Sequence, residues 1–316
     1  MTLPVTIITG FLGAGKTTLI GRLLRDPRYA RTAVIVNEFG EIALDHDLIA
    51  AGDETLLSLA TGCLCCAVRS DLVVTLLDLA ARRDVGEVAF DRVMIETSGL
   101  ADPAPVLHAL MTDAALGAHF AIAAVVTLVD ALLGGATLAA HPEAVRQVAF
   151  ADRVIVTKTD LAPFDDRLMA AIAAHNPLAP VSSGLPDPAL LFAPGQGVTP
   201  PPIARHSQGI TVGLIRRVTP VPALALTLLL ESLAENCGAK LLRVKGLFDV
   251  MEAPGRPAVI HAVQHVIAPV TFLPEWPSED RSSRAVVIGT AIPPHFPARL
   301  LDAICAEVWD EMGCPS

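Results

Sequence analysis

The sequence contains no long basic run and no apolar segment typical of a membrane span. It has 23 lysines and arginines against 33 aspartates and glutamates, which gives a formal net charge of -10. Because an acidic chain without a basic cluster lacks the charge that binding to a phosphate backbone needs, we expect no nucleic-acid partner. The longest apolar run, 120–140, includes Asp130 and two adjacent glycines. This pattern favours a buried strand followed by a turn, so we expect no membrane association.

The region before Gly10 has neither a basic stretch nor a small-residue cleavage site, so it predicts no secretory signal. We therefore expect a cytoplasmic protein. In that reducing compartment a disulfide framework is disfavoured, although the chain has six cysteines. Three of them crowd into residues 63–66, which indicates metal binding or redox chemistry. The default for the scattered Cys237, Cys305 and Cys314 is a structural role.

Short apolar runs rich in valine and isoleucine recur through the first part of the chain. Runs of nearly continuous apolar character are typical of strands covered on both faces, so they predict an α/β domain with a mainly parallel sheet and flanking helices. A helix is expected over 17–24. The expected strands are 5–9, 32–36, 55–59, 92–95, 122–128 and 153–156.

The second part of the chain predicts a smaller α+β domain. Residues 186–209 carry six prolines and several glycines, which indicates a linker, with a long surface loop as the alternative. The predicted domains are therefore 1–185 and 210–316, a division that the length of 316 residues also favours. After the linker we expect strands at 210–218, 240–248, 258–266 and 285–289 and helices at 223–235 and 297–309.

The segment GFLGAGKT, residues 10–17, matches the phosphate-binding P-loop pattern at every fixed position. Glycines let the backbone curl so that its N–H groups surround phosphate oxygens, and the following helix directs its positive end at the same anion. Lys16 is expected to reach the β- and γ-phosphates, and the Thr17 hydroxyl to bind Mg²⁺. The predicted contacts here are Gly10, Gly13, Ala14, Gly15, Lys16, Thr17 and Thr18.

An acidic residue, Glu96, directly follows the apolar run 92–95. In a P-loop protein such a carboxylate can hold Mg²⁺ directly or through water, and the nearby Gly99 N–H can sense the γ-phosphate. Glu in place of the usual Asp departs from the general pattern, and an ordinary strand-end Glu is the alternative. We therefore predict Lys16, Thr17, Glu96 and Gly99 as the catalytic set, with Thr17 and Glu96 as the Mg²⁺ ligands.

The residues after the run 153–156 resemble the guanine-specificity loop Asn-Lys-x-Asp, with Thr157 in the place of Asn. The Asp160 carboxylate can accept two hydrogen bonds from the guanine N1–H and exocyclic amine, and Lys158 can lay its stem along the base. Thr157 offers a hydroxyl but is expected not to reproduce the loop tether of an Asn amide. A plain helix N-cap is the alternative for Asp160. The strength of guanine selection stays open.

The cluster Cys63, Cys65 and Cys66 is the unusual feature of the chain. Thiolates bind Zn²⁺ and similar ions, and a turn here could bring two or three sulfurs together. A structural zinc site normally has four ligands in two spaced pairs, and the sequence has no second pair. An incomplete site suits a metal carrier, whereas a buried structural role for the cysteines is the alternative.

Taken together, these motifs resemble those of the CobW-like metallochaperone GTPases. Further matches are the segments 37–41, 62–66, 96–99, 243–246 and 283–289. The resemblance implies GTP hydrolysis, with Mg²⁺, coupled to the transfer of a transition metal such as Zn²⁺ or Co²⁺ to a client metalloprotein. It implies metal binding by the cysteines, with Glu38 as a possible added ligand. The histidine-rich stretch of many relatives is missing from this chain, whose nine histidines are dispersed.

The hypothesis for function is a switch. Bound GTP would order the loops that carry Glu38 and Glu96 and assemble the thiolates around a metal, and hydrolysis would release it. No general base is evident, so we expect slow intrinsic turnover. A P-loop small-molecule kinase is one competitor, and a metal-buffering or redox module without nucleotide coupling is the other. The sequence leaves open the physiological metal, the client and the oligomeric state.

Overall fold

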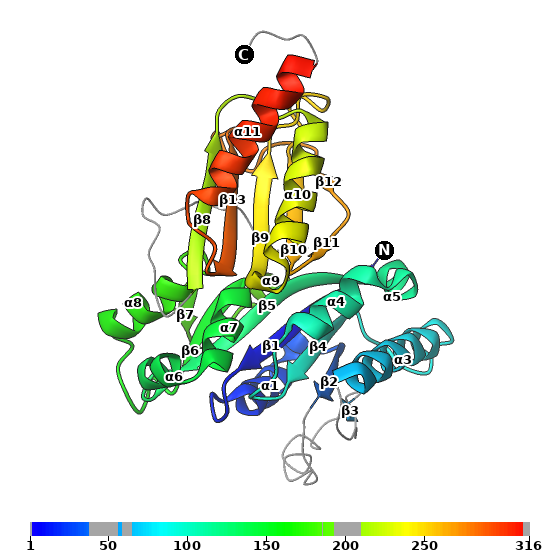
Figure 1. Ribbon diagram of the computed structural model, residues 1–316. Coiled ribbons are helices and arrows are strands. Elements are labelled where there is room, and N and C mark those ends of the chain that lie inside the picture. Colours follow the sequence, from blue (N-terminus) through cyan, green and yellow to red (C-terminus); the bar gives the residue numbers. More distant parts are fainter. Residues whose placement is uncertain (1, 38–55, 59–64, 185, 193–209, 312–316) are drawn as a thin grey trace. The chain divides into compact units, whose positions relative to one another are not determined.

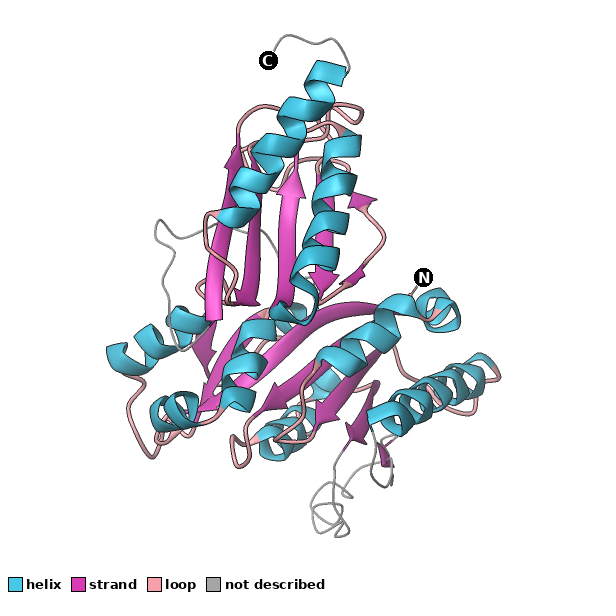
Figure 2. Cartoon of the chain, viewed as in Figure 1, coloured by secondary structure: helices cyan, strands magenta, loops and turns pink. Residues whose placement is uncertain are grey.

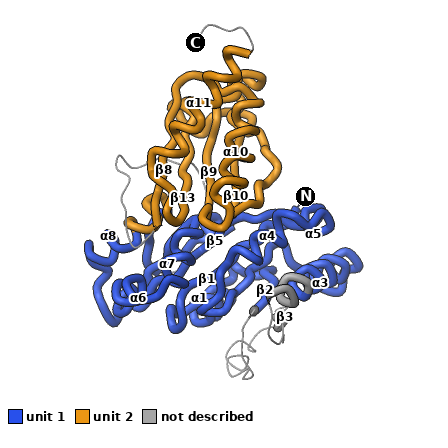
Figure 3. Tube along the Cα trace, in the orientation of Figure 1, with its two compact units in different colours: residues 1–172, 179–195 blue, residues 173–178, 196–316 orange. Residues whose placement is uncertain are grey.

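The computed structural model describes residues 2–37, 56–58, 65–184, 186–192 and 210–311 (Figure 1). The chain divides into two compact units, the first made of residues 1–172 and 179–195 and the second of residues 173–178 and 196–316 (Figure 3). Within the described ranges, no helix combines the length and the apolar character needed to cross a bilayer.

The first unit is built on a seven-stranded sheet, and each pairing between its described strands is parallel. The order across the sheet is β3-β2-β4-β1-β5-β6-β7. This confirms the predicted mainly parallel α/β fold. The strands are β1 (Leu3–Gly10), β2 (Thr32–Asn37), β3 (Leu56–Ser58), β4 (Arg92–Thr97), β5 (Phe120–Asp130), β6 (Arg153–Thr157) and β7 (Val181–Ser183).

Helices flank this sheet, as Figure 2 shows. Helix α3 (Cys65–Asp84) was not predicted from the sequence, although its buried Leu72, Leu76, Leu79 and Ala80 recur at the spacing of one helix face. The other helical elements are α1 (Lys16–Leu24), η1 (Pro27–Tyr29), α4 (Ala104–Thr112), α5 (Ala114–His119), α6 (Gly134–Ala140), α7 (Pro142–Phe150), α8 (Asp166–His175) and α9 (Pro188–Phe192).

The predicted linker, 186–209, begins too early. Its first residues include helix α9, which packs in the core of the first unit: Leu191 is fully buried, and the Thr6 hydroxyl donates to the Leu191 carbonyl at 2.7 Å. The Tyr29 hydroxyl likewise donates to the Pro186 carbonyl at 2.7 Å. These long-range bonds outweigh the local turn preference of the prolines. Residues 193–209 of the predicted linker lie outside the described residues.

The second unit contains an antiparallel sheet in the order β11-β10-β9-β13-β8, with β12 paired to β10. The strand predicted over 258–266 ends earlier, because Gln264 adopts a positive φ of 52° in a turn before β11. The elements are β8 (Ile210–Arg217), α10 (Ala223–Cys237), η2 (Gly238–Lys240), β9 (Leu241–Phe248), β10 (Ala258–Val263), β11 (Val266–Ile267), β12 (Thr271–Phe272), β13 (Ser283–Thr290) and α11 (Phe296–Glu311).

Helices α10 and α11 lie on one face of this second sheet (Figure 2). Their buried side chains, among them Leu229, Leu233 and Leu301, join Val244 and Val287 of the strands in one apolar cluster. The sheet with its two helices is the small α+β unit that the sequence predicts.

Candidate functional site

The predicted phosphate loop connects β1 to α1, and its glycines are needed for its shape. Gly10 has a φ of +143°, and a Cβ there would lie 2.5 Å from the Leu128 carbonyl oxygen. Gly15 is the N-cap of α1 with a left-handed φ of 90°. A backbone curled in this way before a helix N-terminus is the arrangement that binds an anion.

Lys16 begins α1 and is nearly buried. Its Nζ donates to the Gly10 carbonyl at 2.9 Å and, less closely, to the Phe11 carbonyl at 3.4 Å. The ammonium group therefore lies inside the loop that the sequence assigns to phosphates. The two acceptors named here are neutral carbonyls, and phosphate oxygens are stronger, charged partners for an ammonium group.

Thr17 and Glu96 come from elements far apart in the sequence and meet at this edge of the sheet. The Thr17 hydroxyl donates to Glu96 Oε1 at 2.7 Å, and Glu96 is only 5% exposed. Glu96 lies beside Ile8 of β1 in the sheet register, close to the start of the phosphate loop. A hydroxyl and a buried carboxylate are the oxygen ligands that Mg²⁺ prefers, so this pair fits a magnesium ion.

Gly99 follows β4 and lies directly against the phosphate loop. A Cβ at Gly99 would lie 2.8 Å from both the Cα and the backbone nitrogen of Leu12. Only a glycine allows this approach, because Cβ atoms essentially never come so near to a backbone atom. The segment after Glu96 is thus in contact with the loop that the phosphates would occupy.

Thr157 corrects one expectation from the sequence. Its hydroxyl donates to the Ala14 carbonyl of the phosphate loop at 2.7 Å, with the Val129 carbonyl at 3.4 Å. We expected that a threonine could not reproduce the tether of an asparagine, and this was wrong. The hydroxyl reaches because β6 ends close to the loop: a Cβ at Gly15 would lie 3.8 Å from Thr157 Cβ.

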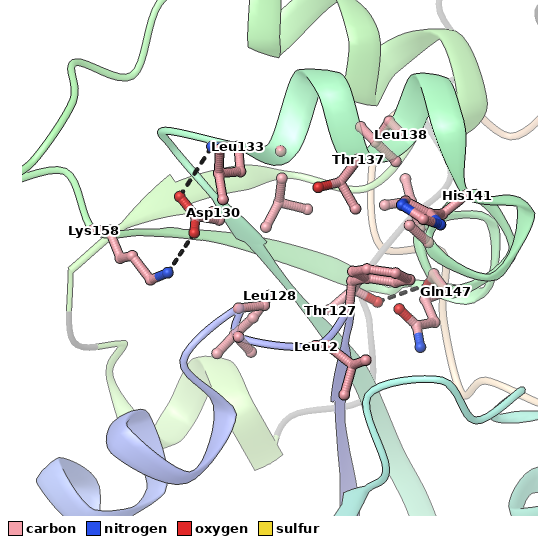
Figure 4. A pocket seen from close by; sticks show the side chains of 17 residues that line it. Leu12, Thr127, Leu128, Asp130, Leu133, Thr137, Leu138, His141, Gln147 and Lys158 are labelled. Carbon is pink, nitrogen blue, oxygen red and sulfur yellow. Dashed lines mark hydrogen bonds and ion pairs between the residues drawn. The ribbon is translucent and has the colours of Figure 1, made fainter.

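Lys158, the next residue, forms an ion pair with Asp130 at the end of β5 (Figure 4). Burial alone would raise the pKa of Asp130, but hydrogen bonds from Lys158 and from the Leu132 and Leu133 N–H groups hold that pKa below its usual value. The ionised carboxylate fixes the Lys158 side chain beside the phosphate loop. This role of Asp130 was not predicted from the sequence, although Asp130, like Glu96, ends an apolar run.

The remaining predicted nucleotide contacts lie at the same edge. Gly13 and Ala14 belong to the phosphate loop, Thr18 is exposed in the first turn of α1, and Asp160 is exposed just after β6. The carboxyl ends of β1, β4, β5 and β6 thus bring the described candidate residues together. This is the edge at which open parallel sheets bind their ligands.

A cavity of about 300 Å³ lies beside the phosphate loop, between the end of β5 and helices α6 and α7 (Figure 4). The Asp130–Lys158 pair lies at one end of it, and Leu12, Thr127 and Gln147 lie near the other. Gln147 is fully buried, and the sequence analysis did not single it out. A polar residue on an otherwise apolar helix face was the available signal.

The predicted transition-metal ligands are only partly within the described chain. Cys65 and Cys66 are the first residues of α3, but their side chains lie outside the described set. Cys63 and Glu38 also lie outside the described residues. Among the residues that the structure does describe, no group of three or more His, Cys, Asp and Glu side chains could hold a metal ion.

A glycine loop that surrounds an anion, where a strand of a parallel sheet meets a helix, defines the class of P-loop nucleotide-binding proteins. Within that class, the chain belongs to the CobW/HypB/UreG family, whose nucleotide-binding domain matches residues 4–183. The C-terminal domain of the cobalamin synthesis protein cobW matches residues 212–305. The resemblance to the CobW-like proteins is therefore confirmed.

Individual relatives extend this finding along almost the whole chain. The zinc chaperone YjiA of Escherichia coli (strain K12) is 34% identical over 304 residues, which are 92% of this chain and 95% of the relative. The crystal structure of the Zn(II)-bound YjiA GTPase from E. coli has a TM-score of 0.75 at 27% identity, covering 96% of this chain and 99% of that one. The zinc-regulated GTPase metalloprotein activator 1 of Schizosaccharomyces pombe is 34% identical over 165 residues, 50% of this chain and 39% of the relative.

Proposed function

We propose that this chain is a GTP-hydrolysing metallochaperone that binds a transition metal, Zn²⁺ in preference to Co²⁺, and transfers it to a client metalloprotein. The names of the relatives support this assignment: one is a zinc chaperone, another a zinc-regulated GTPase metalloprotein activator. Because thiolate ligands need a reducing compartment, the proposal includes a cytoplasmic location.

The phosphate loop binds the triphosphate in this proposal. The N–H groups of Gly13 and Gly15 point at phosphate oxygens, and Lys16 exchanges its loop carbonyls for the β- and γ-phosphates. Thr17 and Glu96 would hold Mg²⁺, which neutralises charge on those phosphates when bound. The 2.7 Å contact between the two side chains supports their pairing.

The loop after β6 selects the base. Asp160 accepts hydrogen bonds from the guanine N1–H and amine, and the Lys158 stem packs along the ring. The Thr157 hydroxyl keeps this loop joined to the phosphate loop through Ala14, which supports a fixed distance between base and phosphates. With Asp160 as the reader, GTP is preferred to ATP, because adenine offers no matching pair of donors.

The observation that carries the coupled function is the register of β2 against β4 and of β3 against β2. Asn37, the last residue of β2, lies opposite Thr97, which directly follows Glu96. Ser58, the last residue of β3, lies opposite Val36 at the same edge. The end of β2 thus lies beside Glu96, and Glu38 follows Asn37 directly in the sequence, whereas the end of β3 lies one strand further from Glu96. In this proposal a change at the γ-phosphate reaches the metal ligands through the end of β2.

In this proposal Cys63, Cys65 and Cys66 bind the metal as thiolates, with Glu38 as an added oxygen ligand. Binding of GTP favours the arrangement in which these ligands converge, and hydrolysis releases it. Thermodynamic linkage then requires that the metal tighten GTP binding by the same factor by which GTP tightens metal binding. Intrinsic hydrolysis is slow, since no residue is assigned as the general base.

The test is a titration of the reduced protein with Co²⁺ under anaerobic conditions, read by thiolate-to-metal absorption. It is run with Mg²⁺ and a non-hydrolysable GTP analogue and, separately, with Mg²⁺ and GDP. A competing chelator then gives the Zn²⁺ affinity in each state. We expect at least fivefold tighter binding with the GTP analogue, the lower end of common coupling energies at roughly 1 kcal/mol.

Matched controls separate the cluster from the other thiols. Replacing Cys63, Cys65 and Cys66 by serine should abolish the absorption. Replacing the buried Cys237 or Cys305 by serine should leave it unchanged. Equal metal affinity in both nucleotide states would overturn the coupled function and favour an independent metal-buffering site. Absorption that survives the triple substitution would place the metal elsewhere.

A further inference from the structure

One buried amide joins helix α7 to the segment that follows β4. Gln147 is fully buried, and its Nε2 donates to the carbonyls of Gly99 and Ala101, both at 3.1 Å. We call residues 98–102 the loop 98–102. Its Gly99 N–H is the group proposed above to contact the γ-phosphate. The Gln147 side chain thus holds the loop at two positions, the carbonyls of Gly99 and Ala101.

Helix α7 is itself anchored, so it can serve as a fixed support for that loop. The Thr127 hydroxyl of β5 donates to the main-chain carbonyl of Gln147 at 2.7 Å in the buried interior. The preceding residue of the helix, Arg146, donates to the Asp102 carboxylate at 2.5 Å. Asp102 also accepts from the Ala104 N–H at 2.9 Å, near the start of α4. Helix α7 therefore holds the loop 98–102 through two adjacent side chains.

The opposite side of the loop 98–102 touches the phosphate loop. Gly99 lies so close to Leu12 that a Cβ could not be accommodated. Leu12 and Gln147 also line the cavity of about 300 Å³ beside α7, and Figure 4 shows them near the same end. A small shift of the loop 98–102 would therefore change its distance to the phosphate loop, with open space to receive Leu12.

A purely stabilising role explains Gln147 less well. Its Oε1 is buried, and no donor among the described residues reaches it. Burying an amide with one end unsatisfied has a free-energy cost that an apolar side chain of similar size avoids. The two hydrogen bonds to loop carbonyls are therefore accompanied by a loss of folding stability, which is common at functional sites.

We propose that Gln147 is a positioning residue whose amide sets the distance between the loop 98–102 and the phosphate loop. The Gly99 N–H then contacts the γ-phosphate only when the amide holds the loop in place. Gln147 accordingly controls how well the protein distinguishes GTP from GDP. This inference rests on the proposed function, because it assumes that the phosphate loop binds GTP.

The test compares the wild type with Gln147→Met, which keeps the length of the side chain but cannot donate. Affinities are measured for fluorescently labelled GDP and for a labelled non-hydrolysable GTP analogue, both with Mg²⁺, together with kcat and KM for GTP. We expect the affinity for the GTP analogue and kcat to fall about tenfold, the equivalent of one to two neutral hydrogen bonds. The affinity for GDP should stay within about twofold, because GDP has no γ-phosphate to contact.

Two further variants keep the result interpretable. Thr127→Val removes one anchor of α7 while leaving the Gln147 amide on the loop, so it should lower the thermal midpoint and change the ratio of GTP-analogue to GDP affinity by less than Gln147→Met does. Arg146→Met removes the partly exposed contact to Asp102 and should reduce the same ratio by a smaller factor. If Gln147→Met does not fold, Arg146→Met carries the test alone.

Three results would contradict the positioning role: an unchanged affinity ratio in Gln147→Met, an equal loss for both nucleotides, or the same ratio change in Thr127→Val. These failures differ from a failure of the proposed function, in which the wild type itself would not bind GDP or hydrolyse GTP. A wild type that hydrolyses GTP while Gln147→Met discriminates normally would leave the proposed function intact and remove only this inference.

Discussion

The two units of the chain bury charged side chains in different settings. In the first unit Glu96 and Asp130 lie at the carboxyl ends of strands, and Lys16 lies at the start of α1, after the phosphate loop. In the second unit Arg243 and Arg284 lie within strands. Both settings remove charge from water, which has a cost unless strong partners replace the solvent.

The partners of these charges differ as well. Arg284 donates to the carbonyls of Asp280 and Ser282 at 2.8 and 3.2 Å, and its guanidinium lies 5.6 Å from the centre of the Trp276 ring. These partners come from one short segment, residues 276–282. Lys16 instead donates to carbonyls of the glycine-rich loop that precedes it. A bound ligand could replace these carbonyls as acceptors. In both cases the acceptors are carbonyls of a loop; Arg284 also lies against an aromatic ring, whereas Lys16 begins the helix that follows its glycine loop. We therefore expect a structural role for Arg284 and a ligand-binding role for Lys16.

The largest effect that could break this comparison is expected at Lys16. Lys16→Met should lower the affinity for Mg²⁺-bound nucleotide on the order of 1,000-fold, because charge-assisted bonds to two phosphates contribute about 1.5–3 kcal/mol each. The thermal midpoint of the nucleotide-free protein should not fall, since the substitution also removes a desolvated cation. Calorimetric titration and thermal unfolding measure the two quantities. A loss of stability with unchanged affinity would make Lys16 structural after all.

The sequence predicted the phosphate loop and the parallel sheet because both depend on local pattern. Gly10, Gly13 and Gly15 are required by backbone shape, and the strands by apolar runs. The Thr157 tether was not predictable, because it depends on how near β6 ends to Ala14. Gln147 was missed for the same reason: its partners, Gly99 and Ala101, are distant in the sequence. Sequence pattern identifies residue types, whereas tertiary approach decides which of them meet.

A substitution in the second unit tests the same comparison. Arg284→Met should lower the free energy of unfolding of the second unit by about 2 kcal/mol, from lost charge-assisted bonds and a cation–π contact. Nucleotide affinity should not change. Both tryptophans of the chain, Trp276 and Trp309, belong to the second unit, so their fluorescence during denaturation reports on that unit selectively.

The control for that substitution is Arg216→Met. Arg216 lies opposite Arg284 in the strand register, but its side chain is 65% exposed. It forms an ion pair with Asp280, which is also exposed, at 3.3 Å between Nη2 and Oδ2. An exposed ion pair of this kind contributes less than about 1 kcal/mol. Equal effects of the two substitutions would show that burial in the second unit does not decide the role of its cations.

The smallest expected effect concerns Asp130, the buried anion that pairs with Lys158. Asp130→Asn keeps an acceptor for the Leu132 and Leu133 N–H groups and removes only the ion pair, so at neutral pH it should lower stability by about 1 kcal/mol or less. The pKa of Asp130 is lowered in the folded protein, so its contribution is complete above the unfolded pKa of about 3.9 and is lost as the pH falls through the folded value. Denaturation of both proteins from neutral to acidic pH should therefore give a constant difference that shrinks only below about pH 4. The absence of any difference at neutral pH would mean that the Asp130–Lys158 ion pair does not contribute measurably to stability, and would remove Asp130 from the buried charges that matter in the first unit.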